Sequence, residues 1–133
     1  DDKIVKVIAG QFEKAKGPQI NHNVEPIYFH IVLNEDKKFE CEVPENHNSF
    51  IYLLNGELNI GKKNHNKTDN SNLILLESGK KLAVKANKKS EFLFFAGKPI
   101  GEPIARGGPF VMNTKAEILE AIQDYNNGKF AKY

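Results

Sequence analysis

The feature that most constrains the fold of this chain is a series of short segments in which successive side chains lie on opposite faces. In residues 27–33, Phe29 and Ile31 share one face, and Tyr28 and His30 share the other. A period of two residues is typical of a β-strand. The other predicted strands are residues 3–9, 39–43, 49–54, 57–60, 73–76, 82–86 and 91–95. Short strands joined by polar turns, with no helix between them, predict an all-β sandwich or barrel.

Residues 49–54 are almost continuously apolar. Such a run is typical of a strand that is covered on both of its faces. Asn55-Gly56 follows directly and is a strong hairpin signal, because a type I′ turn requires positive φ at both central residues. We therefore expect residues 57–60 to return as the second strand of a hairpin, with Leu58 and Ile60 facing inward.

The C-terminal part of the chain has a different character. Glycines and prolines interrupt residues 97–109, which predicts an irregular segment rather than a strand. Thr114 and Glu117 form the pattern of a capping box, which marks the start of a helix. An apolar stripe at helical spacing follows, and Gly128 is a plausible end of the helix. We expect one domain over residues 1–133, all-β with one C-terminal α-helix.

Composition and charge exclude several classes of protein. Of the 133 residues, 40% are hydrophobic and 27% are charged, which is typical of a folded globular domain. The net charge is +2, and the lysine pairs lie in separate loops, so we expect no direct binding to nucleic acid. No apolar run approaches the roughly 18 residues of a membrane span, and we see no signal peptide. We expect no membrane partner.

The chain has a single cysteine, Cys41, which shares a strand face with Phe39 and Val43. This position predicts a small core residue rather than a nucleophile. One cysteine cannot form an internal disulfide, which fits a reducing compartment. We therefore expect an intracellular location, cytoplasmic in a bacterium and cytoplasmic or nuclear in a eukaryote.

The four histidines are His22, His30, His47 and His65, and no two of them have the close spacing of a common metal site. His30 and His47 are the weak candidates for metal ligands. Our prediction is nevertheless no metal site and no catalytic residue. The sequence also lacks a serine nucleophile elbow and a phosphate-binding glycine loop. One alternative stays open, because a barrel can bring histidines of distant strands together.

Residues 94–104 (FFAGKPIGEPI) and 108–114 (GPFVMNT) closely resemble the C-terminal part of the pirin family. Residues 117–130 resemble that family's closing helix, and residues 50–58 its preceding strands. Residues 7–10 and 17–18 are similar to the opening of its second half. The resemblance covers essentially the whole chain.

Pirins are two-domain cupins, so the resemblance implies a cupin-type double-stranded β-helix for this chain. The family's metal site, made of histidines and a glutamate, lies in the N-terminal half, so none of its ligands transfers to the present residues. We therefore expect no cofactor in this chain and Fe(II) in the N-terminal half. The expected partner is the N-terminal cupin domain, in the same protein or in another subunit. The absence of an initiator methionine agrees with an excised or truncated half.

The motif of the C-terminal part also has a physical interpretation. We expect Gly108-Pro109 to form a turn, and Phe110 and Met112 to place apolar side chains beside the closing helix. Arg106 has Glu102 as its nearest candidate partner, the alternative being a solvated arginine. The candidate structural motif consists of Gly97, Pro99, Gly101, Glu102, Pro103, Arg106, Gly108, Pro109, Phe110, Met112 and Asn113, with the helix cap Thr114 and Glu117.

Three functions are compatible with these features. The first is a C-terminal cupin domain without its own metal site, acting as structural or regulatory partner of a metal-binding N-terminal cupin. The second is a cupin enzyme of the quercetin 2,3-dioxygenase type. The third is a protein-interaction module of a transcriptional co-regulator. A barrel interior that holds a small ligand is a further possibility.

Overall fold

The structure is a computed structural model that describes residues 2–19, 23–61, 67–68 and 72–130. Its contacts divide the chain into two compact units, Asp1–Pro99 and Ile100–Tyr133, which we describe separately as the β-unit and the C-terminal unit. A single domain over residues 1–133 therefore stays a prediction.

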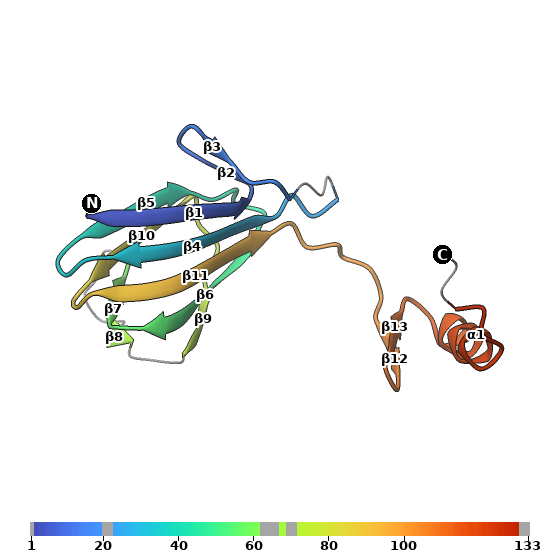
Figure 1. Ribbon diagram of the computed structural model, residues 1–133. Helices are drawn as coiled ribbons and strands as arrows, with labels where there is room; N and C mark the ends of the chain where they lie inside the picture. The colour runs from blue at the N-terminus through green and yellow to red at the C-terminus, as the bar shows by residue number, and fades with distance from the viewer. Residues whose placement is uncertain (1, 20–22, 62–66, 69–71, 131–133) are drawn as a thin grey trace. The chain divides into compact units, whose positions relative to one another are not determined.

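The β-unit contains two facing antiparallel sheets (Figure 1). The five-stranded sheet has the order β1 (Lys3–Ala9), β4 (Ile27–Leu33), β11 (Ser90–Gly97), β6 (Asn48–Asn55) and β9 (Leu73–Leu76). The four-stranded sheet has the order β5 (Lys38–Glu42), β10 (Lys81–Ala86), β7 (Leu58–Ile60) and β8 (Lys67–Thr68). A small hairpin, β2 (Gln11–Phe12) and β3 (Ala15–Lys16), follows β1. This arrangement confirms the predicted all-β class.

Successive strands switch between the two sheets. The chain leaves the five-stranded sheet after β4, after β6 and after β9, and each time enters the four-stranded sheet. The last strand of the β-unit is β11, which lies between β4 and β6. Its residue Phe94 is opposite both Phe29 and Ile51. This winding of the chain between two sheets is that of a double-stranded β-helix.

The core lies between the sheets and is rich in phenylalanine. Phe29, Phe92 and Phe94 enter it from the five-stranded sheet and Phe39 from the four-stranded sheet, each with less than 2% of its surface exposed. The rings of Phe39 and Phe92 meet edge to face across the sheets, with centroids 6.2 Å apart. Aromatic pairs in this geometry add to the free energy gained by burying apolar surface.

The predicted hairpin at Asn55-Gly56 is wrong. β6 and β7 lie in different sheets and do not pair, so these two residues carry the chain from one sheet to the other. Of Asn55 and Gly56, only Gly56 has a positive φ (+100°). The buried Ser90 hydroxyl accepts a hydrogen bond from the Glu57 amide at 2.9 Å and fixes this crossing. Leu58 and Ile60 face inward as predicted.

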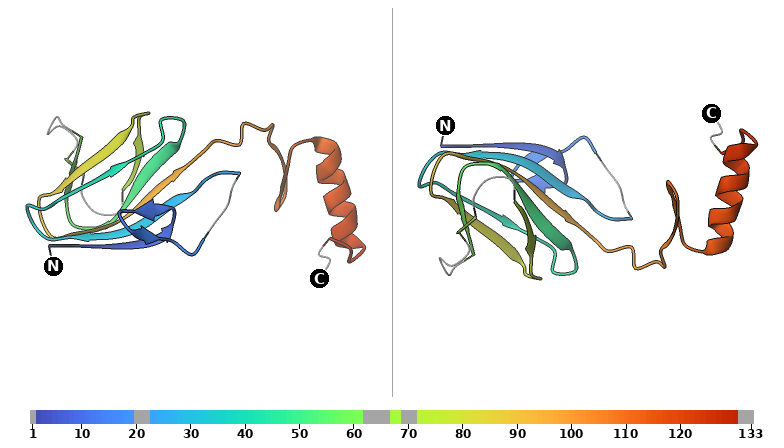
Figure 2. Two further views of the ribbon diagram at one scale, coloured as in Figure 1. Left: turned by 90° about the horizontal axis from the view of Figure 1, so that it is seen from above. Right: turned by 90° about the horizontal axis from the view of Figure 1, so that it is seen from below.

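The C-terminal unit consists of a hairpin and a helix (Figure 2). The hairpin strands are β12 (Ala105–Gly107) and β13 (Phe110–Met112), and the helix is α1 (Lys115–Asn126). The prediction of an irregular segment over 97–109 is therefore wrong for Gly97, which ends β11, and for β12. Gly108 has φ of +57°, as the first central position of a type II′ turn requires, so a strand pair forms despite the glycines.

The helix begins where the sequence predicts. Thr114 is its N-cap and Gly128, with φ of +67°, follows its end. Ile118 and Ala121 are buried within the unit, and a Cβ atom at Gly107 would lie 2.3 Å from Ile118 Cγ2. A glycine at this position therefore lets the helix pack closely on the hairpin. Among the described residues, no helix is long and apolar enough to cross a bilayer.

We expect Gly56→Ala to destabilise the β-unit strongly. An added Cβ would lie 2.3 Å from Ser90 Oγ and 2.5 Å from Ser90 Cα, at a positive φ. Steric overlap and backbone strain together should lower the free energy of unfolding by about 3 kcal/mol. Chemical denaturation measures this value.

Gly61→Ala is the matched control. Gly61 also has positive φ (+81°), but a Cβ there meets no atom of the described residues within 4 Å. Strain alone should cost about 1 kcal/mol. Equal losses for the two variants would contradict the close approach of Ser90 to Gly56.

Candidate functional site

The interior of the β-unit, where a hollow barrel would hold a ligand, is filled with side chains. Phe12 of the β2–β3 hairpin contacts both Phe29 and Phe39, with ring centroids 5.8 and 5.3 Å apart. Cys41 lies beside this core, and burial raises the pKa of its thiol to about 12. Such a thiol is protonated at neutral pH, which agrees with the prediction of a packing residue.

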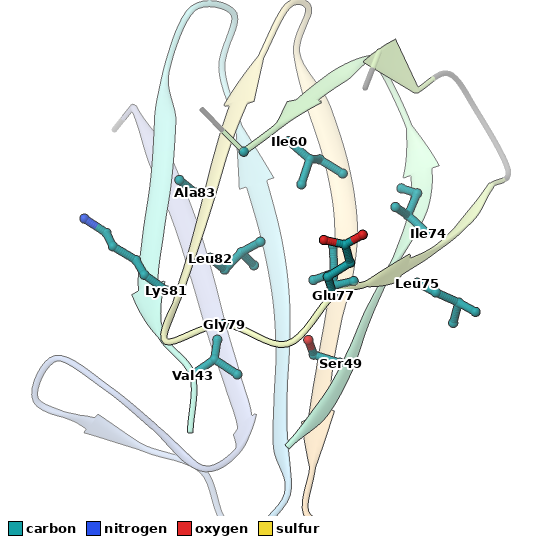
Figure 3. Close-up of a pocket in the computed structure, with 12 residues that line it drawn as sticks. Val43, Ser49, Ile60, Ile74, Leu75, Glu77, Gly79, Lys81, Leu82 and Ala83 are labelled. Carbon is teal, nitrogen blue, oxygen red and sulfur yellow. The ribbon is translucent and has the colours of Figure 1, made fainter. Parts of the chain in front are cut away.

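The open edge between the two sheets holds a cavity of about 340 Å³ (Figure 3). Its wall is about as polar as apolar, with Ile60, Ile74 and Leu82 among the apolar residues that line it. Glu77 and Lys81 supply charges at its margin. None of the described residues that line it is a histidine.

The two candidate metal ligands lie in different surroundings. His30, on β4, has Nε2 2.6 Å from Glu91 Oε1 of the neighbouring strand β11. His47 lies just before β6 and is buried, with Nε2 3.9 Å from Glu25 Oε2. The part of the chain that the structure describes contains no group of three or more His, Cys, Asp or Glu arranged to hold a metal. His22 and His65 lie outside the described residues, so the absence of a metal from this chain stays a prediction.

The outer face of the five-stranded sheet is apolar and aromatic. Tyr28, Phe95 and Phe50 stack in one row across β4, β11 and β6, with ring centroids 4.2 and 4.7 Å apart. Leu75 of β9 is opposite Phe50 and continues this row. A second row runs parallel to the first and consists of His30, Leu93, Tyr52 and Leu73.

Several side chains of this outer face are exposed. Leu75 has 77% of its surface exposed, Leu73 58% and Tyr52 38%. The sequence predicts that residues 49–54 are covered on both faces, yet Tyr52 and Leu54 are uncovered in this chain. Large contiguous apolar patches on a protein surface usually mark an interface. We call this surface the outer face, defined by Tyr28, Phe50, Tyr52, Leu54, Leu73, Leu75, Leu93 and Phe95.

The hypothesis of a partner domain implies an exposed apolar docking patch, but sequence reasoning did not locate it on this face. The signal that could have located it is the hydrophobic character of both faces of β6 and β11. In most half-exposed strands hydrophobic and polar residues alternate, but in these two strands the outward positions are mostly hydrophobic as well. Phe94 faces the core, for example, while Phe95 faces outward.

The C-terminal unit uses its motif residues mainly to hold itself together. The Asn113 side-chain amide donates hydrogen bonds to Glu102 Oε2 and to the Pro103 carbonyl, both at 2.9 Å. Glu117 Oε2 accepts from the amides of Asn113 and Thr114, and the Glu117 amide donates to the Thr114 hydroxyl. These bonds join the entry segment, the hairpin and the helix, and they confirm the predicted capping box.

The predicted pairing of Arg106 with Glu102 is not found. Arg106 is exposed on β12 and forms no ion pair with any residue that the structure describes, while Glu102 pairs with Asn113. This exposure agrees with the alternative of a solvated arginine. The expected position of Phe110 beside the helix is confirmed, because its ring contacts those of Tyr125 and Phe130. The remaining motif residues lie at the end of β11 (Gly97), after it (Pro99), before β12 (Gly101), in the hairpin turn (Pro109) and on β13 (Met112).

We expect α1 to lose its first turn in acid. The pKa of Glu117 is lowered, chiefly because the Thr114 hydroxyl hydrogen-bonds to its carboxylate and also because the Thr114 amide does. A lowered folded-state pKa contributes stability that is present above the ordinary value of 4.5 and is lost as pH falls through the folded value. Amide hydrogen exchange of residues 115–118 against pH measures the loss.

Glu117→Gln is the control for this titration. The amide side chain still accepts at the N3 position of a capping box but does not titrate. The variant should therefore show helix protection that is independent of pH below neutrality. An unchanged acid loss in Glu117→Gln would assign the loss to another group.

Comparisons with known proteins agree with this architecture. The family model described as the pirin C-terminal cupin domain matches residues 28–131. A pirin-like protein of Solanum lycopersicum is 34% identical over 131 residues, which are 97% of this chain and 45% of the relative. The chain therefore spans less than half of that relative's length.

Solved structures show the same fold. A quercetin 2,3-dioxygenase from Acinetobacter baumannii is 36% identical with a TM-score of 0.84, over 96% of this chain and 44% of that one. A bacterial pirin from Escherichia coli in complex with nickel(II) matches with a TM-score of 0.51 at 17% identity, over 56% of this chain and 31% of its own. At that identity the second match supports the fold alone. The winding of the two sheets, the closing helix and the match over residues 28–131 together show that the chain belongs to the pirin family, as a C-terminal cupin domain.

Proposed function

We propose that this chain is a non-catalytic half of a two-cupin protein and that its outer face docks on the N-terminal cupin domain. The observation that carries the proposal is the partly exposed aromatic row of Tyr28, Phe95 and Phe50, with the exposed Leu75 at its end. A sheet with hydrophobic residues on both faces is stable in water when both faces are covered. One face is covered by the four-stranded sheet, and the other is open for a partner domain.

The length of the relatives supports this choice of partner. The chain covers about 45% of the tomato pirin-like protein and 44% of the Acinetobacter dioxygenase, so each of these proteins contains about as much chain again. The resemblance to pirins assigns that additional chain to a second cupin. A second cupin brings a sheet of its own, and two sheets pack face to face through apolar side chains.

The C-terminal unit offers a second apolar surface. Ile104, Val111, Leu119 and Tyr125 each expose at least 60% of their surface, although α1 and the hairpin pack on each other. The helix therefore has an apolar side beyond the one that holds Ile118 and Ala121 against the hairpin. We propose that this side contacts the partner cupin as well.

Metal chemistry belongs to the other half in this proposal. The packing of Phe29, Phe39, Phe92 and Phe94 between the sheets supports this division, because these rings occupy the middle of the β-unit. The N-terminal half would then hold Fe(II), and the present chain would support that half structurally. The relative solved as quercetin 2,3-dioxygenase favours this type of reaction for the whole protein. A role as transcriptional co-regulator and an intracellular location stay predictions.

The proposal is tested by charges placed on the outer face. In the two-domain protein, Tyr52→Glu and Leu73→Glu should each lower the free energy of unfolding by about 3 kcal/mol, because a carboxylate would be buried without a partner. In the isolated chain the same positions are partly exposed, and the loss should stay below about 1 kcal/mol. Denaturation of both proteins measures the difference.

Lys85→Glu is the control, since Lys85 lies on the four-stranded sheet with its side chain 42% exposed. It should affect the two proteins equally. If Tyr52→Glu and Leu73→Glu also destabilise both proteins equally, the outer face is not the docking surface.

A further inference from the structure

Two Asn-Gly pairs occur in the sequence, Asn55-Gly56 and Asn127-Gly128. Asparagine before glycine is open to an internal reaction, because glycine has no Cβ to hinder the approach of its backbone nitrogen to the asparagine side chain. The reaction requires rotation of the peptide that joins the two residues. Both asparagines are exposed, so the freedom of the backbone decides which pair reacts.

The fold holds the backbone of Asn55-Gly56 in place. Asn55 ends β6 and is opposite Glu91 of β11. At Gly56 the backbone runs so close to Ser90 that an added Cβ would lie 2.5 Å from Ser90 Cα. The Ser90 hydroxyl also accepts from the Glu57 amide at 2.9 Å, so the next peptide is fixed as well. Rotation at Asn55 therefore requires opening of the β-unit around β6 and β11.

The second pair, Asn127-Gly128, lies at a helix end, where local opening costs least. Asn127 is the C-cap of α1 and directly follows its last helical residue. A Cβ added at Gly128 would meet nothing within 4 Å in the part of the chain that the structure describes. The Gly128 amide donates to the Tyr125 carbonyl at 3.1 Å, a bond of the last helical turn. Helix ends fray, so this bond breaks at a small cost in free energy.

We propose that Asn127 is a site of spontaneous deamidation in the folded chain and that the fold protects Asn55. The Gly128 backbone nitrogen attacks Asn127 Cγ, the new N–C bond closes a succinimide ring, and the Cγ–Nδ2 bond breaks. The proton of the Gly128 amide goes to the departing nitrogen, which leaves as ammonia. Water then opens the ring at either carbonyl, which gives aspartate or isoaspartate at position 127.

The product changes the end of the helix. An aspartate places a negative charge at the negative end of the helix dipole, and the last turn of α1 has no basic residue to offset it. An isoaspartate also adds a carbon to the backbone, at a residue whose amide donates to the Gln123 and Tyr125 carbonyls. The modified chain should therefore hold its last helical turn less firmly. The proposal is independent of docking at the outer face, because neither asparagine belongs to that face.

Peptide mapping by mass spectrometry tests the proposal, after the chain has been incubated in warm, mildly alkaline buffer. The mass change from amide to carboxylate identifies the site, and isoaspartate among the products distinguishes the succinimide route from direct hydrolysis. We expect Asn127 to react at least about tenfold faster than Asn55, because opening a helix end costs less than opening the β-unit. The rate should rise with pH, since the attacking amide nitrogen must lose its proton.

The same chain unfolded in denaturant is the reference, in which the two pairs should react at rates within about threefold of each other. Ser90→Ala removes the hydroxyl that fixes the Glu57 amide, so it should speed the reaction at Asn55 at least about threefold and leave Asn127 unchanged. Asn127→Gln should abolish the fast reaction, because glutamine would have to close a larger ring. The reference and Asn127→Gln keep the test valid if Ser90→Ala does not fold.

A fast reaction at Asn127 with isoaspartate among its products, together with a slow reaction at Asn55, supports the proposal. Three results for the folded chain would overturn it. These are equal rates at the two sites, a faster reaction at Asn55, and no reaction at Asn127 under conditions in which the unfolded chain reacts there.

Discussion

The packing of phenylalanine rings between the two sheets is the interaction on which the rest of this structure depends. Phe29 and Phe94 face each other on adjacent strands, and Phe39 and Phe92 meet across the sheets. Because these rings fill the centre of the β-unit, the fold gains its stability where a hollow cupin would hold its ligand. The surfaces and the ends of the β-unit are then the places left for binding.

The same sheet that supplies most of these rings also supplies the outer face. Along β11, Phe92 and Phe94 are buried in the core while Leu93 and Phe95 face outward. Hydrophobic side chains on both faces of the sheet have a free-energy cost, since apolar surface stays exposed to water in the isolated chain. A partner sheet removes that cost, and the relatives of about twice this length contain the chain to provide one. Structure and family therefore support the same division of roles between two cupin halves.

Local sequence signals predicted local structure well and connections between sheets poorly. The strand 27–33 and the capped helix follow from periodicity and from the pair Thr114 and Glu117, which act over a few residues. Asn55-Gly56 misled the prediction, because a hairpin and a crossing between sheets both need a glycine with positive φ, and only the distant Ser90 distinguishes them. His47 and Glu25 approach each other from separate segments, so no spacing in the sequence could reveal that they lie close together. The short strands β12 and β13 form around Gly108-Pro109, where composition alone favours an irregular segment.

The central claim is that the outer face is covered by the N-terminal cupin domain. Hydroxyl-radical footprinting of the two-domain protein and of this chain alone tests it most directly, because it reports the exposure of individual side chains. The claim predicts that Tyr52, Leu73 and Leu75 are oxidised severalfold more slowly in the two-domain protein, while Phe12, which packs toward the core, keeps its rate. Equal oxidation rates of the three residues in both proteins would show that the outer face stays in water and would contradict the claim.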